Sequence, residues 1–157
     1  LIAPSWGSNF YQFDTHNKIF EILKRNKKKF IFRPHYMSIK KKEFDLKNID
    51  LSSDLIDLSS SFNLNNYKNL ISDWSGIFFE FLIIKKKKPY LINTKMKVNN
   101  RQYKIYSTLP IELELRNEIT HNFELNELDK FENLISKNEI VEDDFSKIDK
   151  IIRSKFY

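Results

Sequence analysis

The sequence predicts an α/β fold in which helices cover both faces of a parallel sheet. Through the first 95 residues, short apolar segments alternate with segments of helical periodicity. That alternation is typical of βαβ units, which build parallel sheets. A chain of 157 residues is long enough to bury a core, and apolar residues make up 41% of it, with 15% aromatic. We therefore expect an ordered domain rather than a disordered chain.

Five segments are expected as strands because each is a short apolar run bounded by polar residues or proline. They are residues 1–4, 30–32, 54–61, 70–73 and 89–93. Pro4 and Pro34 end the first two, since proline has no N–H to donate to a ladder.

Helical spacing of apolar residues predicts the helices between these strands. Helices are expected at 15–28, 63–70 and 75–87, with one helical turn within 36–53. Residues 94–106 form an expected loop, and for residues 109–119 both strand and helix remain open. Two amphipathic helices are expected near 124–137 and 143–155. The chain is thereby divided into a domain of residues 1–120 and a C-terminal helical segment, 121–157, that packs on it.

The charge and residue types restrict the possible functions. A formal charge of +6 suits binding to a nucleic acid, an anionic membrane surface or a phosphorylated ligand. The alternative is that the charge reflects the composition of a Lys/Asn/Ile-rich proteome. The lysine runs 27–29, 40–42 and 85–88 lie at the ends of expected elements, where solvated ends are the simplest interpretation. Without cysteine, and with three scattered histidines, no metal site or cofactor is expected. The longest apolar stretch, 77–84, is too short to cross a bilayer.

Unusual polar residues follow three of the expected strands, in the motifs APSWGS, FRPH and SDWSG. In open α/β sheets, ligands bind outside the carboxyl ends of the strands. These three motifs are therefore expected to converge on one edge of the sheet, where they form a binding site.

The SDWSG motif opens a helix, whose first N–H groups lack intrahelical partners and favour an anion. Gly76 would let a phosphate approach the backbone, Ser75 adds a hydroxyl donor and Asp73 caps the turn. Glu80, one turn into the helix, could accept hydrogen bonds from ribose hydroxyls. The alternative is an ordinary helix start with Glu80 facing solvent.

The other two motifs supply further candidates. Arg33 suits bidentate pairing with a phosphate, and His35 has an imidazole that could donate to a phosphate or a leaving group. Ser5 and Gly7 lie in the loop after the first strand, near the same expected edge. Together with Asp73, Ser75, Gly76 and Glu80 they are the residues expected to bind the substrate. A surface arginine and a loop histidine are the alternative interpretation of FRPH.

Taken in order, APSW, then RPH about 27 residues later, then SDWSGIFFEF and KKPYLIN resemble the CDP-glycerol glycerophosphotransferase family. The resemblance runs from residue 1 to about 93. It implies a Rossmann-like, nucleotide-binding C-terminal half of a GT-B-type transferase. Because the chain begins within a strand and without Met, we expect a fragment whose preceding N-terminal domain is absent.

The resemblance also implies roles for individual residues. Arg33 and His35 would meet the diphosphate of the donor as catalytic residues, Ser75 and Gly76 would cradle it at the helix start, and Glu80 would be the acidic position that ends the family turn. The chain departs from the family pattern in having Trp74 for Tyr, Gly76 for Ser, Glu80 for Asp and Tyr36 for Pro, which leaves the donor open.

The expected activity is transfer of glycerol phosphate from CDP-glycerol, or a related CDP-activated donor, to a polymer or lipid-linked acceptor, as in teichoic acid synthesis. The expected location is cytoplasmic, peripheral on the inner membrane face and in contact with its anionic surface. One alternative is a nucleotide-sugar-dependent GT-B glycosyltransferase of surface polysaccharide synthesis. The other is a basic nucleic-acid-binding domain, although no nucleic-acid motif is present and none is expected as a partner.

Overall fold

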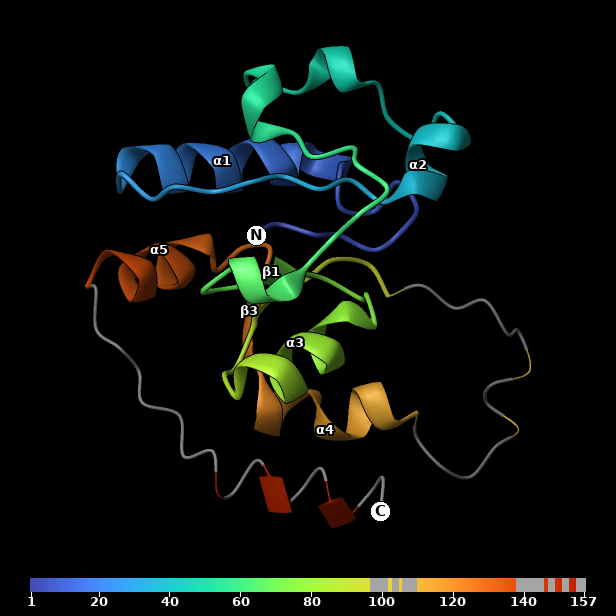
Figure 1. Cartoon of the computed structure of the whole chain (residues 1–157), viewed down its shortest axis with the longest axis vertical. Helices are drawn as coiled ribbons and strands as arrows, with labels where there is room; N and C mark the ends of the chain where they lie inside the picture. Colours follow the sequence, from blue (N-terminus) through green and yellow to red (C-terminus); the bar gives the residue numbers. More distant parts are fainter. Residues whose placement is uncertain are drawn as a thin grey trace.

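The computed structural model describes residues 1–96 and 110–137, together with residues 102, 105, 146, 149, 150, 153 and 154 (Figure 1). Most of the loop predicted at 94–106 and of the helix predicted near 143–155 lies outside the described residues.

A parallel sheet lies at the centre of the fold. Its strands are β1 (Ile71–Ser72), β2 (Tyr90–Asn93) and β3 (His121–Glu124), in the order β1-β2-β3, and both pairs are parallel. These strands correspond to two of the five predicted segments and to one stretch predicted as helical.

Parallel pairing continues on the other side of β1 through single bridging residues. Ile71 pairs with Ile2, Ile2 with Phe32, and Phe32 with Ile56. Hydrogen bonds on both sides of the first segment support this pairing, because the Ala3 N–H donates to the Ile71 carbonyl at 2.9 Å and the Arg33 N–H to the Ile2 carbonyl at 2.8 Å. The first three predicted strands therefore lie in the sheet, although each contributes a single bridging residue.

Numbered along the chain, the three bridging segments and the three strands lie side by side in the order 3-2-1-4-5-6. This is the order of a doubly wound sheet. The second and third segments lie on one side of the first segment, and the fourth, β1, lies on its other side. The carboxyl ends of the first segment and β1 are the topological switch point, where such sheets bind ligands.

Five α-helices are described. They are α1 (Thr15–Arg25), α2 (Tyr36–Lys40), α3 (Ile77–Lys85), α4 (Ile111–Ile119) and α5 (Leu128–Ser136). Short 3₁₀ turns lie at Gln12–Asp14, Leu46–Asn48, Ser53–Leu55 and Leu64–Asn66. Of the strand predicted at 54–61, only the bridging residue Ile56 pairs in the sheet, directly after the turn that ends at Leu55. The helix predicted at 63–70 is reduced to the turn Leu64–Asn66.

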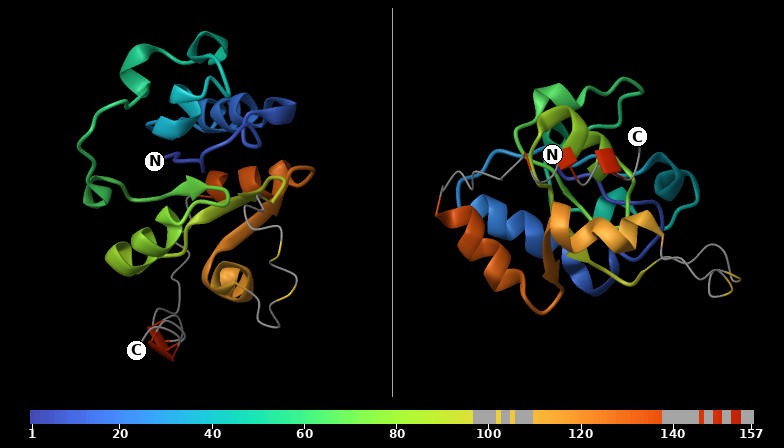
Figure 2. Two further views of the ribbon diagram at one scale, coloured as in Figure 1. Left: turned by 90° about the vertical axis from the view of Figure 1, so that its right-hand side faces the viewer. Right: turned by 90° about the horizontal axis from the view of Figure 1, so that it is seen from below.

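Alternate residues of the sheet enter two separate cores. Ile2 and Ile71 belong to the core under α1 and α5, whereas Leu1, Ala3 and Leu70 belong to the core under α3 and α4. This alternation follows from the two-residue period of a strand. Figures 1 and 2 show α1 and α5 on one face and α3 and α4 on the other. The predicted α/β class, a parallel sheet with helices on both faces, is confirmed.

The open interpretation of residues 109–119 is resolved in favour of the helix α4. Its buried residues include Leu115 and Ile119, which lie four positions apart and so share one face. α5 confirms the helix predicted near 124–137.

The division of the chain after residue 120 is wrong, because residues 121–124 are a strand of the same sheet. β3 pairs with β2, Phe123 is buried, and His121 stacks on Tyr90 with ring centroids 5.3 Å apart. The sequence HNFE has a single apolar residue, Phe123. Such a polar sequence is possible because β3 is an edge strand, whose side chains need not all be buried. Its pattern therefore gives little signal for a strand.

Of the two glycines in the chain, only Gly7 has a backbone that requires glycine. Its φ is 111°, which L side chains rarely adopt, and its N–H donates to the Ser38 hydroxyl of α2 at 2.9 Å. Gly76 has helical angles, φ −60° and ψ −15°. A Cβ at Gly76 would meet no atom within 4 Å.

Gly7→Ala should lower the free energy of unfolding by about 1–3 kcal/mol, the usual cost of a strained backbone conformation. Gly76→Ala is the matched control and should change it by less than about 1 kcal/mol. Urea unfolding followed by tryptophan fluorescence measures both. An equal loss in the two variants would contradict the assignment of strain to Gly7.

Candidate functional site

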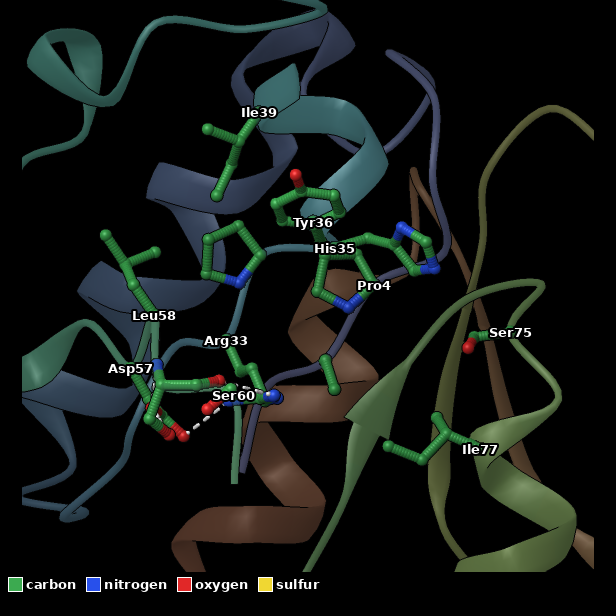
Figure 3. Close-up of a pocket in the computed structure, with 13 residues that line it drawn as sticks. Pro4, Arg33, His35, Tyr36, Ile39, Asp57, Leu58, Ser60, Ser75 and Ile77 are labelled. Carbon is green, nitrogen blue, oxygen red and sulfur yellow. Dashed lines mark hydrogen bonds and ion pairs between the residues drawn. The ribbon is translucent and has the colours of Figure 1, made fainter. Parts of the chain in front are cut away.

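A cavity of about 490 Å³ lies at the carboxyl ends of the first four parallel segments, at the switch point of the sheet (Figure 3). Four stretches line it, one after each segment, together with Ile39 of α2. They are Ala3–Pro4, Arg33–Tyr36, Asp57–Ser60, and Ser75 with Ile77. The predicted convergence of the three motifs on one edge of the sheet is confirmed.

Arg33 is held at the cavity by the segment that follows the third bridging residue. Its Nη1 donates to Asp57 Oδ2 at 2.8 Å, its Nη2 donates to the Ser59 carbonyl at 3.0 Å, and its guanidinium lies 4.6 Å from the centre of the Phe62 ring. These contacts use two of the five guanidinium N–H donors. Arg33 is therefore oriented while keeping donors for a ligand.

Asp57 is the counter-charge that sequence reasoning missed. Burial alone raises the pKa of its carboxyl, but hydrogen bonds from the Ser59 hydroxyl and N–H, together with the charge of Arg33, outweigh burial and leave the pKa lowered. Asp57 therefore stays ionised and offsets much of the charge of Arg33. The motif DLSS carried no charge-pairing signal, because the pairing depends on strand order rather than on spacing.

His35 begins α2 as its N-cap. Its Nδ1 accepts a hydrogen bond from the Met37 N–H at 3.1 Å, so the ring proton lies on Nε2 while this bond is made. The bond fixes the ring beside the cavity that His35 lines. Tyr36, the next residue, lies at the rim and is 68% exposed.

The start of α3 borders the cavity on the opposite side. Ser75 and Ile77 line it, and the first N–H groups of a helix lack intrahelical partners. Gly76 is exposed and has open space in front of its Cα. Glu80 is exposed and is not among the lining residues. The predicted position of Ser75 thus agrees with the cavity, whereas that of Glu80 does not.

Ser5 and Asp73, which were expected to bind substrate, bind each other instead. The Asp73 carboxylate accepts from the Ser5 N–H at 2.6 Å, the Ser5 hydroxyl at 3.0 Å and the Thr94 hydroxyl at 3.2 Å. Asp73 is 1% exposed, and its burial raises the pKa of the carboxyl, against the hydrogen bonds from Ser5, Trp74 and Thr94. Neither residue lines the cavity; they position the loop beside it, as Gly7 does through α2.

A buried arginine on α4 completes this support. Arg116 is 4% exposed; its Nη1 donates to the Asp73 carbonyl at 2.9 Å, and its Nε and Nη2 donate to Asn93 Oδ1 at 3.0 and 2.7 Å. Its guanidinium lies 3.9 Å from the centre of the Trp74 ring. Burial lowers its pKa to about 10. Arg116 therefore holds the turn that presents Ser75, although the sequence offered no spacing argument for it.

Comparison with protein-family models, with curated proteins and with solved structures found no match for this chain. Among the described residues, no group of three or more acidic or histidine side chains could hold a metal ion. None of the helices in that part of the chain is long and apolar enough to cross a bilayer.

Asp73→Asn should lower the free energy of unfolding by about 1–3 kcal/mol, because an amide NH₂ replaces an acceptor oxygen and leaves a buried donor unpaired. The control is Asp54→Asn, an exposed carboxylate in a 3₁₀ turn. Urea unfolding at neutral pH compares the two. Unchanged stability of Asp73→Asn would contradict a supporting role for this carboxylate.

Proposed function

We propose that this chain is the nucleotide-binding part of a CDP-glycerol glycerophosphotransferase-like enzyme of cell-surface polymer synthesis. The observation that carries the proposal is the cavity at the switch point, where Arg33, His35 and the start of α3 face one space. The order of the motifs along the chain, which resembles that family, supports the choice of donor.

The size and lining of the cavity suit a nucleotide-linked diphosphate. A volume of about 490 Å³ lies within the range of small-molecule sites. Arg33 and the first turn of α3 offer donors for phosphate oxygens. Because Asp57 offsets much of the charge of Arg33, the backbone N–H groups at Ser75 and Gly76 carry much of the phosphate binding. The exposed side chains of Tyr36 and Leu58 offer apolar surface to a base at the rim.

In the proposed reaction an acceptor hydroxyl attacks the distal phosphorus of CDP-glycerol and loses its proton to water. The bond from that phosphorus to the oxygen it shares with CMP breaks, and CMP leaves. Arg33 and His35 stabilise the negative charge that develops on the departing CMP phosphate, an electrostatic role that acts in the transition state. The acceptor is a polymer or lipid-linked chain. The enzyme works at the inner face of the cell membrane as a peripheral protein.

Calorimetric titration of the chain with CDP-glycerol, CMP, UDP-glucose and a short DNA duplex tests the proposal. CDP-glycerol and CMP should bind, and Ser75→Ala and Arg33→Ala should each weaken CDP-glycerol binding about tenfold or more, as expected for a lost hydrogen bond to a charged group. Arg25→Ala is the control, because this arginine pairs with Glu132 on the surface away from the cavity.

The double variant Arg33→Ala, Asp57→Ala separates two effects of removing Arg33. If Arg33 donates hydrogen bonds to the ligand, the double variant still binds CDP-glycerol weakly. If instead the unpaired Asp57 carboxylate repels the ligand in Arg33→Ala, the double variant recovers its affinity. Equal binding of UDP-glucose and CDP-glycerol would favour a nucleotide-sugar transferase. Salt-sensitive DNA binding without nucleotide binding would contradict the proposal in favour of a nucleic-acid-binding domain.

A further inference from the structure

A second cavity, of about 720 Å³, lies at the amino ends of the parallel segments, the end of the sheet opposite the candidate site. Six lysines line it, and we call it the lysine cavity. They are Lys27, Lys28, Lys29, Lys68, Lys85 and Lys87. None of the described residues that line it is acidic. The lysine cavity therefore concentrates positive charge of the same magnitude as the formal charge of the whole chain, +6.

The attraction between a lysine and the negative C-terminal end of a helix dipole explains the position of only some of these six lysines. Lys27–Lys29 follow α1, at the left of Figure 1, and Lys85 and Lys87 lie at the end of α3. Lys68 lies in the connection that leads into β1, away from any α-helix end. These three stretches lie far apart in the sequence. They surround one cavity because each precedes a parallel segment, and the amino ends of parallel segments lie at the same end of the sheet.

The described contacts of Lys85 and Lys87 bring no opposite charge to the cavity. Lys85 Nζ donates to the Asn65 carbonyl at 3.2 Å and Lys87 Nζ to Asn69 Oδ1 at 2.6 Å, both neutral oxygens. Lys27, Lys29 and Lys68 are exposed. Elsewhere the chain does pair its surface cations, as Arg25 with Glu132 and Lys24 with Asp50. The absence of acidic lining is thus a local property of this cavity.

The floor of the lysine cavity is apolar. Leu23 of α1, Phe30, Ile71 of β1, and Leu134 and Ile135 of α5 line it beneath the lysines. A rim of ammonium groups over an apolar floor matches a ligand with phosphate at one end and hydrocarbon next to it. A small inorganic anion would leave that floor without a partner.

We propose that the lysine cavity docks this chain on an anionic bilayer, with phospholipid headgroups on the lysines and the adjoining hydrocarbon against the floor. Each lysine close to such a surface strengthens binding about fivefold. The proposal gives a surface for the peripheral location that belongs to the proposed function. Its residues are separate from those of the candidate site, so vesicle binding and nucleotide binding can fail independently.

Vesicle sedimentation tests the docking surface. The chain should bind vesicles of phosphatidylcholine mixed with phosphatidylglycerol and should not bind phosphatidylcholine alone. The variant Lys27→Gln, Lys29→Gln, Lys68→Gln should bind the anionic vesicles at least tenfold more weakly. The control Lys40→Gln, Lys42→Gln, Lys47→Gln removes the same charge from exposed lysines near α2 and should lose less than threefold. Circular dichroism confirms that both variants fold.

Two competing ligands set the outcomes that would overturn the proposal. Inorganic tripolyphosphate that binds through the same three lysines, without vesicle binding, would assign the cavity to a soluble phosphate. Equal losses of vesicle binding in the two triple variants would reduce the effect to net charge. Binding of a short DNA duplex that depends on Lys27, Lys29 and Lys68, without vesicle binding, would overturn it in favour of nucleic acid.

Discussion

The buried carboxylate of Asp73 is the constraint on which the arrangement of the candidate site depends. It accepts hydrogen bonds from Ser5 and Thr94, which follow two strands that flank its own, while Arg116 holds its carbonyl from α4. A buried carboxylate needs such partners, because removing it from water is costly. The same bonds fix the turn that starts α3, and with it Ser75.

The parallel sheet gives the molecule two chemically different ends. At the carboxyl ends, chain segments that were far apart in sequence bring Arg33, Asp57 and Ser75 around one cavity with mixed charge. At the amino ends, the turns that follow α1 and α3 gather lysines over an apolar floor. Since all strands point the same way, strand ends and helix ends are sorted by polarity, and each end of the sheet has its own character.

The glycine in SDWSG shows that the sequence alone does not reveal which glycine the fold requires. The fold does not require a glycine at position 76, because the backbone angles there are helical and an added Cβ would meet open space. The structural demand for glycine falls on Gly7, whose φ is positive. A ligand that approaches the backbone of Gly76 remains the proposed reason for a glycine there. Residue type alone did not tell these two positions apart.

The sequence by itself determined the fold class, most of the elements and the convergence of three motifs, because these follow from local periodicity and from the direction of parallel strands. It did not determine β3, whose polar residues give no strand pattern, or the partners Asp57 and Arg116. Nor did it show that Ser5 and Asp73 face each other rather than the cavity. Those features depend on strand order and on which buried charges meet, and only the tertiary structure decides them.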